Sequence, residues 1–335
     1  MAEHTPDPGR WWLGFDIGGT RTKSGVVSDD GEVRQAHARE TTHEPFERVW
    51  EHLLTHADDA LQREGATDLA GIGIAAPGLV DPHFGVRNLP GKVLGIEGFP
   101  LRERLEDRYG VPVRCLNDGA AATLAEWRFG VAQGYEDVFG LTIGTGIGAG
   151  AIIGGRPLVT RNLAAGASFG HATIRTGGRT CLCGNVGCAE TLVSANAVVG
   201  RMRDYVARKV PSTITEAYER EPGRITFKTL VEGVEAGDDV AEEIMRHFCR
   251  DLGATVVTAI HAYDPEVVVL AGGPMARADH FLPQVQAYVD RYAFRYPKDR
   301  VIPILCAERS DHAGVLGAVA RVMQTVADAA PASRP

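Results

Sequence analysis

The chain has 335 residues, of which 44% are hydrophobic and 23% are charged, so it is long enough for two globular domains. Its formal net charge of −8 argues against a surface for nucleic acid or for an anionic membrane. The polar start MAEHTPDPGR lacks the features of a secretory signal, and no apolar run reaches the length of a bilayer span. We therefore expect a cytoplasmic protein without a nucleic-acid or membrane partner.

The first predicted element is a glycine-rich hairpin. From Trp11, the sequence WWLGFDIGGTRTKSGVV predicts two strands whose turn contains Gly18, Gly19 and Thr20. The backbone N–H groups of such a turn and the hydroxyl of Thr20 suit a phosphate, and Asp16 is placed to hold Mg²⁺ through water. A plain hairpin turn with a solvated Asp16 is the alternative.

A helix, a buried strand and a loop follow the hairpin. Apolar residues three and four apart predict a helix over residues 45–64, and LAGIGIAAPGLVD over 69–81 predicts a buried strand that ends in a turn. RNLPGKV over 87–93 is predicted as a loop in which Asn88 can hydrogen-bond a hydroxylated ligand. A turn-forming asparagine is an equally good interpretation of Asn88.

Asn117 and Asp118 join a strand predicted over 111–116 to a helix predicted over 119–129. An acid at the carboxyl end of such a strand lies where ligands of α/β sheets bind. Asp118 is therefore a natural general base. An N-cap role for Asn117 or Asp118 is the alternative.

A second glycine-rich hairpin is predicted over residues 136–158. Its turn contains Gly144, Thr145 and Gly146 between two apolar strands. The sequence GTGIG is weak support for a phosphate site when it stands alone. Two such hairpins in one chain favour an internal duplication in which each half contributes one phosphate loop.

Residues 166–190, GASFGHATIRTGGRTCLCGNVGCAE, contain His171, Cys181, Cys183 and Cys188 at H-x9-C-x-C-x4-C spacing. Three thiolates and one imidazole can close a tetrahedral Zn²⁺ site that has no open position, which predicts a structural metal. A cysteine-rich loop without metal and a disulfide are the alternatives. A reducing compartment disfavours the disulfide.

The last part of the chain predicts helices joined by two short strands. Gly272 and Gly273 follow the buried strand VVVLA and let a flat or phosphorylated group approach the backbone, although a plain strand-to-helix turn explains them as well. The predicted helices cover residues 189–209, 227–236, 238–263 and 313–326, and the predicted strands cover 267–271 and 301–305.

These motifs together resemble those of the ROK family of sugar kinases, within the actin, hexokinase and Hsp70 superfamily. The most specific match is CLCGNVGCAE, and FDIGGT, APGLVD, NLPG, NDGAAA, LTIGTGIGAG and VVVLAGG support it in the family's order. The resemblance implies an α/β protein of two actin-like (ribonuclease H-like) domains, each with a mixed sheet flanked by helices, and a cleft between them. We expect a smaller domain over residues 1–116 that includes the C-terminal segment 313–335. A larger domain over 117–312 would carry the zinc-binding loop 166–190.

The resemblance also implies ATP-dependent phosphoryl transfer to a sugar hydroxyl, and a homodimer. Asp118 would be the base that receives the hydroxyl proton, and Asp16 would assist the Mg²⁺ bound to ATP. Asn88, Asn117, His171 and Glu190 would contact sugar hydroxyls, with His171 also a zinc ligand. The nucleotide would be held by glycine turns, with phosphates at Gly18, Gly19, Thr20, Gly144, Thr145 and Gly146 and the adenosine at Gly272 and Gly273.

One residue departs from the family pattern. Glucose-phosphorylating members have a glutamate in an ExGH motif where this chain has Ser168. Loss of a charge-assisted hydrogen bond weakens ordinary glucose binding by about 1.5 to 3 kcal/mol if nothing compensates. We therefore expect an acceptor that has drifted to an aminosugar, a ketose or a cyclitol, with glucokinase proper as the alternative. Which hydroxyl reacts, and whether polyphosphate replaces ATP, does not follow from the sequence.

Two other functions compete with a kinase. Sugar-responsive repressors of the family carry a winged-helix segment before their first strand. In this chain the first strand is expected to begin near Trp11, and the excess of acidic residues disfavours binding to DNA. A catalytically inactive sugar-binding protein is disfavoured because Asp118 is intact.

Overall fold

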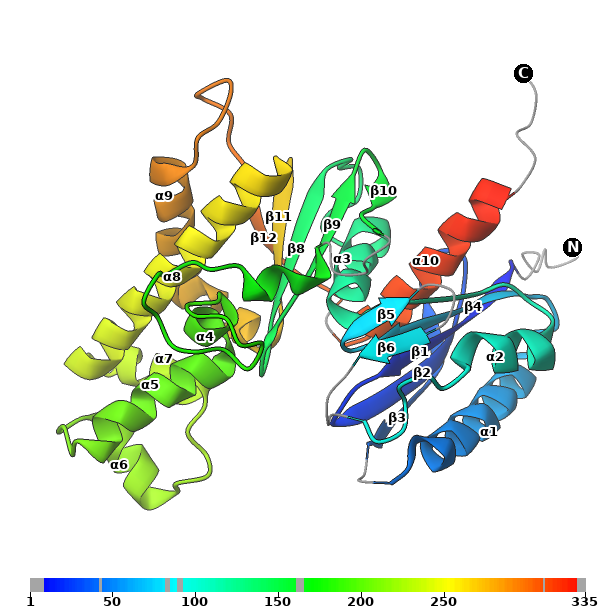
Figure 1. The fold of residues 1–335 in the computed structure, drawn as a ribbon, viewed down its shortest axis with the longest axis horizontal. Helices are drawn as coiled ribbons and strands as arrows, with labels where there is room; N and C mark the ends of the chain where they lie inside the picture. Colours follow the sequence, from blue (N-terminus) through cyan, green and yellow to red (C-terminus); the bar gives the residue numbers. More distant parts are fainter. Residues whose placement is uncertain are drawn as a thin grey trace, which may run out of the picture. The chain divides into compact units, whose positions relative to one another are not determined.

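The computed structural model describes residues 9–41, 44–81, 85–88, 93–160, 166–309 and 311–329. The chain forms two compact units, whose elements are labelled in Figure 1. As far as these ranges are described, unit 1 comprises Met1–Gln133, Val159–Ala164 and Glu308–Pro335, and unit 2 comprises Gly134–Leu158 and Ala165–Ala307.

Unit 1 contains a mixed five-stranded sheet in the order β3-β2-β1-β4-β7. β2 is antiparallel to both β3 and β1, and β4 and β7 run parallel to β1. The strands are β1 (Trp11–Ile17), β2 (Arg21–Val27), β3 (Val33–Glu40), β4 (Leu69–Ala76) and β7 (Val113–Asn117). A separate two-stranded ladder joins β5 (Leu79–Asp81) to β6 (Gly85–Asn88).

Helices cover both faces of the unit 1 sheet, as Figure 1 shows. They are α1 (Phe46–Glu64), α2 (Leu101–Tyr109), α3 (Asp118–Phe129) and α10 (Ala313–Ala329). Alternate residues of a strand point to opposite faces. In β1, Leu13 and Phe15 join the core beneath α1 and α2, whereas Gly14 contacts Val315 of α10.

The close approach of α10 to the sheet depends on glycine. A Cβ atom at Gly73 of β4 would lie 2.0 Å from the backbone oxygen of Ala318, and one at Gly317 would lie 1.8 Å from that of Ala121 in α3. Side chains at these positions would push the helix away. The sequence therefore places α10 directly on β4 and α3.

The carboxylate of Glu126 ties the end of α3 to the segment where the chain returns to unit 1. Its two oxygens accept hydrogen bonds from the N–H of Val131 at 3.1 Å and of Arg309 at 2.6 Å. Contacts therefore place α3 in unit 1, whereas the boundary expected from the sequence, at residue 116, assigned it to the larger domain.

Unit 2 repeats the strand arrangement of unit 1. Its sheet has the order β10-β9-β8-β11-β12, with β8 antiparallel to β9 and parallel to β11. The strands are β8 (Val138–Ile143), β9 (Ile147–Ile153), β10 (Arg156–Pro157), β11 (Val267–Ala271) and β12 (Ile304–Cys306). This repeat agrees with the internal duplication inferred from the two glycine hairpins.

The remaining elements of unit 2 are helical and enclose its core with the sheet. They are the 3₁₀ helices η1 (Ala167–His171) and η2 (Gly273–His280), and the α-helices α4 (Glu190–Val193), α5 (Ala195–Ala207), α6 (Thr213–Arg220), α7 (Phe227–Glu235), α8 (Asp239–Tyr263) and α9 (Leu282–Tyr292). Two mixed sheets flanked by helices confirm the predicted fold class. The predicted cleft between the domains stays a prediction.

Three local predictions were wrong. The helix expected over 189–209 breaks at Ser194, whose extended backbone and hydroxyl cap α5. The strand expected over 301–305 begins only at Ile304, because Pro303 has no N–H to donate to a ladder. Part of the loop expected over 87–93 is strand β6, and residues 89–92 lie outside the described chain.

Within the described residues, no helix is both long and apolar enough to cross a membrane. The cytoplasmic location stays a prediction.

Candidate functional site

Asp16 lies near the end of β1, on the sheet face that contacts α10. A Cβ atom at Gly314 would lie 2.2 Å from the Asp16 carboxyl carbon, so this carboxyl packs directly on the first turn of α10. Across the hairpin, Asp16 pairs with Lys23 of β2. The ammonium of Lys23 also donates a 2.8 Å hydrogen bond to the backbone oxygen of Asp311, just before α10.

Asp16 is a carboxyl group on the central, largely buried strand of the sheet. Burial raises its pKa from 3.8 to about 6, the charge of Lys23 lowers it, and the charge of Asp118 raises it further. Asp16 and Asp118, the two predicted acids of unit 1, are therefore close enough to interact. A carboxylate held in this way is a ready partner for a cation or a proton.

Asp118 is the first residue of α3 and is exposed, and one of its oxygens accepts the N–H of Gly119 at 2.8 Å. Asn117 caps the helix, because its side-chain oxygen accepts the N–H groups of Gly119 and Ala120. Its amide nitrogen donates to the backbone oxygen of Gly78 at 2.9 Å. The N-cap alternative for Asn117 is thus observed, while its contact with a sugar stays a prediction.

The first glycine turn joins β1 to β2. The N–H of Gly18 donates to the backbone oxygen of Arg21, and the hydroxyl of Thr41 donates to the backbone oxygen of Gly18. Gly19 and Thr20 are exposed at the tip. The turn therefore has a fixed base and an accessible tip, as a phosphate site requires.

The second glycine turn lies against Glu190. One oxygen of the Glu190 carboxylate accepts the N–H of Ile147 at 3.1 Å, and a Cβ atom at Gly146 would lie 2.5 Å from the same oxygen. The backbone oxygen of Gly144 accepts the N–H of Ala195 at the start of α5. Thr145 is exposed at the tip of the turn.

Gly272 lies beside this turn. Its φ is +104°, and a Cβ atom there would lie 2.1 Å from the backbone oxygen of Ile143. This close approach alone requires glycine. Gly273 is exposed, with no described heavy atom within 4 Å of an added Cβ atom. The structure thus brings Gly272 against Ile143, the residue before Gly144. An adenosine contact at Gly272 and Gly273 stays a prediction.

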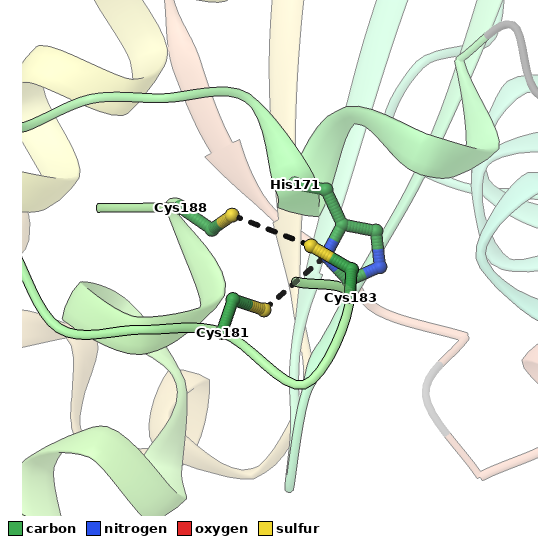
Figure 2. Close-up of side chains that lie close together, drawn as sticks. All are labelled: His171, Cys181, Cys183 and Cys188. Carbon is green, nitrogen blue, oxygen red and sulfur yellow. Dashed lines mark hydrogen bonds between the residues drawn. The ribbon is translucent and has the colours of Figure 1, made fainter. Parts of the chain in front are cut away.

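The four predicted metal ligands converge. Figure 2 shows the ring of His171 and the sulfur atoms of Cys181, Cys183 and Cys188 pointing toward one point, and one ligand atom from each lies within 4.8 Å of all the others. The Cys181 Sγ to His171 Nδ1 distance is 3.6 Å and the Cys183 to Cys188 Sγ distance is 3.7 Å. Zn–S bonds of about 2.3 Å at tetrahedral angles require S···S separations of about 3.8 Å. The arrangement fits a structural zinc ion.

The thiol pKa values explain why a cation belongs there. Burial raises the pKa of Cys188 to about 12 and also raises that of Cys181. The backbone N–H of Asn185 lowers the pKa of the exposed Cys183. A bound metal deprotonates such thiols and offsets the cost of their burial.

The remaining predicted contacts are divided between the units. Ser168 lies in η1, three residues before the exposed His171. Glu190 begins α4, and its second oxygen lies 3.8 Å from Cys181 Sγ, so the metal cluster, Glu190 and the second glycine turn form one group in unit 2. The backbone of Asn88 lies in β6 of unit 1, and its side chain lies outside the described residues.

Lys23 is a functional candidate that the sequence analysis missed. Its charge acts on Asp16, which it faces across the hairpin. The signal was present in the sequence, since a two-residue turn at Gly19 and Thr20 places Asp16 opposite Lys23.

Comparison with known proteins identifies the family. The ROK family profile matches residues 12–325. A glucokinase of Halalkalibacterium halodurans is 30% identical over 315 residues, which cover 92% of this chain and 93% of that protein. The DNA-binding transcriptional dual regulator NagC of Escherichia coli K12 is 30% identical over 290 residues, or 86% of this chain and 68% of that protein.

A solved structure extends the similarity to the fold. The ROK family glucokinase from Streptomyces griseus, in complex with glucose and AMPPNP, superposes with a TM-score of 0.77 at 29% identity, over 94% of this chain and 99% of that one. The two mixed sheets are thus those of actin-like ROK proteins. The chain belongs to the ROK family.

Proposed function

We propose that this protein transfers the γ-phosphoryl group of ATP to a hydroxyl of a sugar or sugar-like acceptor, with Asp118 as the general base. As a ROK member similar to glucokinases over nearly its whole length, the chain is an ATP-dependent carbohydrate kinase. Beyond this activity, we assign the acceptor class and the role of each residue.

Asp118 supports the role of base by its position. It is exposed at the start of α3, and Asn117 fixes the helix end that carries it. A carboxylate there can accept the proton of an attacking hydroxyl while the chain orients the reacting groups. Catalysis of phosphoryl transfer depends mainly on such positioning and on neutralisation of the phosphate charge.

Asp16 and Lys23 supply opposite charges at the first glycine turn. We assign Asp16 to the water shell of the Mg²⁺ bound to ATP, since a carboxylate whose charged form is disfavoured gains most from a cation. We assign Lys23 and the turn at Gly19 and Thr20 to phosphate oxygens. Magnesium when bound neutralises phosphate charge in this chemistry. In unit 2, Gly144, Thr145 and Gly146 are proposed to hold phosphates, with Gly272 and Gly273 beside the adenosine.

The acceptor is proposed to contact His171, Glu190, Ser168, Asn88 and Asn117. With Nδ1 of His171 toward the metal cluster, its other ring nitrogen is left to bind a hydroxyl. The zinc would hold this imidazole in place and take no part in the transfer. Ser168 in place of glutamate favours an acceptor other than glucose, such as an aminosugar, a ketose or a cyclitol.

The observation that carries the proposal is the position of Asp118, which is exposed at the first residue of α3 on a helix end capped by Asn117 and is close enough to Asp16 for their charges to interact. The test is ADP release with Mg·ATP across hexoses, aminosugars, ketoses and cyclitols. Formation of the phosphorylated acceptor tests polyphosphate as an alternative donor. Turnover of at least one acceptor supports the kinase. A higher kcat/KM for glucose than for every other compound would contradict the change of acceptor and make the protein a glucokinase proper.

A non-catalytic regulator is the second candidate, because NagC is 30% identical to this chain. It predicts sugar binding by calorimetry together with absence of turnover for every acceptor. A homodimer is also proposed from family membership. Sedimentation of the purified protein tests it.

A further inference from the structure

We propose that Asp251 is a positioning residue of the metal segment, defined here as residues 171–188. Through Arg175, its buried carboxylate fixes the segment on the helical body of unit 2 and thereby sets metal retention and acceptor affinity. The part that concerns the acceptor rests on the proposed function.

Asp251 lies in α8 and has a side chain that is only 5% exposed. One carboxylate oxygen accepts Nη2 of Arg175 at 2.5 Å, and the other accepts Nη2 of Arg201 in α5 at 2.6 Å. The guanidinium of Arg250 lies 3.8 Å from the same carboxylate. Charge-assisted hydrogen bonds to a carboxylate that water cannot reach are strong and directional. One carboxylate therefore joins α8, α5 and the metal segment.

The backbone of Arg175 connects this junction to the ligands. The N–H groups of Ile174 and Arg175 donate to the backbone oxygen of Gly187, at 2.9 and 3.2 Å. Gly187 has a φ of +73°, and a Cβ atom there would lie 1.7 Å from the backbone oxygen of Arg175. Cys188 follows Gly187 directly, and its backbone forms an antiparallel β-bridge with that of Thr173. A displacement of Arg175 is therefore transmitted to a metal ligand.

A second ion pair in the same segment provides a contrast. Arg179 pairs with Asp204 of α5, but both side chains are more than half exposed, at 54% and 55%. The backbone oxygen of Arg179 accepts the N–H of Gly187, so Arg179 touches the same residue as Arg175. Because exposed ion pairs contribute little, Arg179 controls for loss of an arginine in this segment.

Loosening the segment acts on the acceptor contacts selectively. The segment contains His171, which is both a metal ligand and a proposed acceptor contact. It also contains Cys181, whose Sγ lies 3.8 Å from Glu190, another proposed acceptor contact. Asp118, Asp16 and the first glycine turn belong to unit 1. Glu190 also contacts the second glycine turn, so the KM for the acceptor should rise more than the KM for ATP, with kcat close to that of the unchanged protein.

The experiment compares Arg175→Met with Arg179→Met in the zinc-loaded full chain. Arg175 is 42% exposed, and methionine keeps its apolar stem, so the variant should fold. Zinc release to a chromophoric chelator should be about tenfold faster in Arg175→Met, as for other residues that orient metal ligands, and within about threefold of the unchanged rate in Arg179→Met. Arg175→Lys should restore part of the retention. Equal release rates for both methionine variants would overturn the proposal.

Hydrogen exchange separates this inference from the proposed function. In Arg175→Met, amides of residues 174–187 should exchange faster while those of α5 and α8 do not, and unchanged exchange in the segment would contradict the anchor. If the unchanged protein phosphorylates no acceptor, the proposed function fails while release and exchange still decide the role of Arg175 and Asp251. Equal increases in the KM values for acceptor and ATP would refute the selective effect on the acceptor. Asp251→Asn is the second variant, with the same faster release expected.

Discussion

Asp16 and Lys23 face each other across the hairpin of β1 and β2, and the charge of Lys23 limits the rise that burial causes in the pKa of Asp16. A raised carboxyl pKa means that the fold disfavours the charged form of Asp16. The carboxylate of Asp16 can therefore favour binding of a metal-bound phosphate while it lowers the stability of the protein without that ligand.

Asp16→Asn should stabilise the metal-free protein above pH 6. The folded pKa of about 6 exceeds the unfolded value, so the penalty is absent below pH 4, grows as pH rises and is complete above pH 6. The difference between the unfolded pKa of 3.8 and the folded pKa of about 6 corresponds to about 3 kcal/mol as an upper value. Urea unfolding at pH 4 and pH 8 checks this, with a gain expected only at pH 8. Lys23→Met is the control and should lower the stability of the metal-free protein at pH 8, because loss of the Lys23 charge should raise the pKa of Asp16 further.

Asp118→Asn should lower kcat by at least about 100-fold, because an amide cannot take up the hydroxyl proton. Binding of ATP and of the acceptor should persist, since the substitution preserves shape. Coupled ADP-release kinetics and calorimetry measure both effects. Asp107→Asn, at an exposed position of α2, should leave kcat unchanged. Near-normal turnover of Asp118→Asn would show that another residue is the base.

Ser168→Glu should improve the use of glucose. A carboxylate that accepts a hydrogen bond from a sugar hydroxyl is worth about 1.5 to 3 kcal/mol, which is about tenfold or more in kcat/KM. Ser168→Gln is the matched control, because it adds similar length without charge and should gain less. If glutamate and glutamine give the same kcat/KM for glucose, charge is not what distinguishes this position.

Cys183→Ser should remove the metal without disturbing the core, because Cys183 is exposed whereas Cys181 and Cys188 are buried. About one zinc ion per chain is expected in the unchanged protein, and elemental analysis should find much less in the variant, together with a lower Tm. Cys306→Ser, which changes a partly buried cysteine outside the cluster, should retain the zinc. An active, stable protein that never binds metal would rule out the structural zinc.

Gly73→Ala should destabilise unit 1 by about 3 kcal/mol, because the added carbon would meet backbone atoms of α10 that cannot move aside. Gly223→Ala is the control, since no described heavy atom lies within 4 Å of a Cβ atom there. Chemical denaturation monitored by tryptophan fluorescence measures the difference, because Trp11, Trp12 and Trp50 are buried in unit 1. Equal stability of the two variants would show that α10 packs less tightly on β4.

Local sequence patterns determined much of the fold. The three-and-four spacing of apolar residues placed α1 and α8, and the glycine turns placed both hairpins. The cysteine and histidine spacing identified the four residues whose ligand atoms converge. These features depend on neighbours in the chain, so a periodic pattern or a short motif specifies them. Short elements such as α2, α6 and β6 were missed, because their patterns are too brief to distinguish them from loops.

Only the tertiary structure decided which distant side chains meet. The interaction of Asp16 with Asp118, the contact of Gly314 with Asp16 and the convergence of Arg175 and Arg201 on Asp251 join residues far apart in the chain. No sequence period encodes such pairs, since they arise from how sheet and helix faces pack. The sequence by itself determined the chemistry that is present. The packing decided which of these groups are buried and which charges lie beside them. Burial and neighbouring charges set the pKa values of the carboxyl groups and the strength of the ion pairs, because both depend on the surrounding dielectric and not on the order of residues.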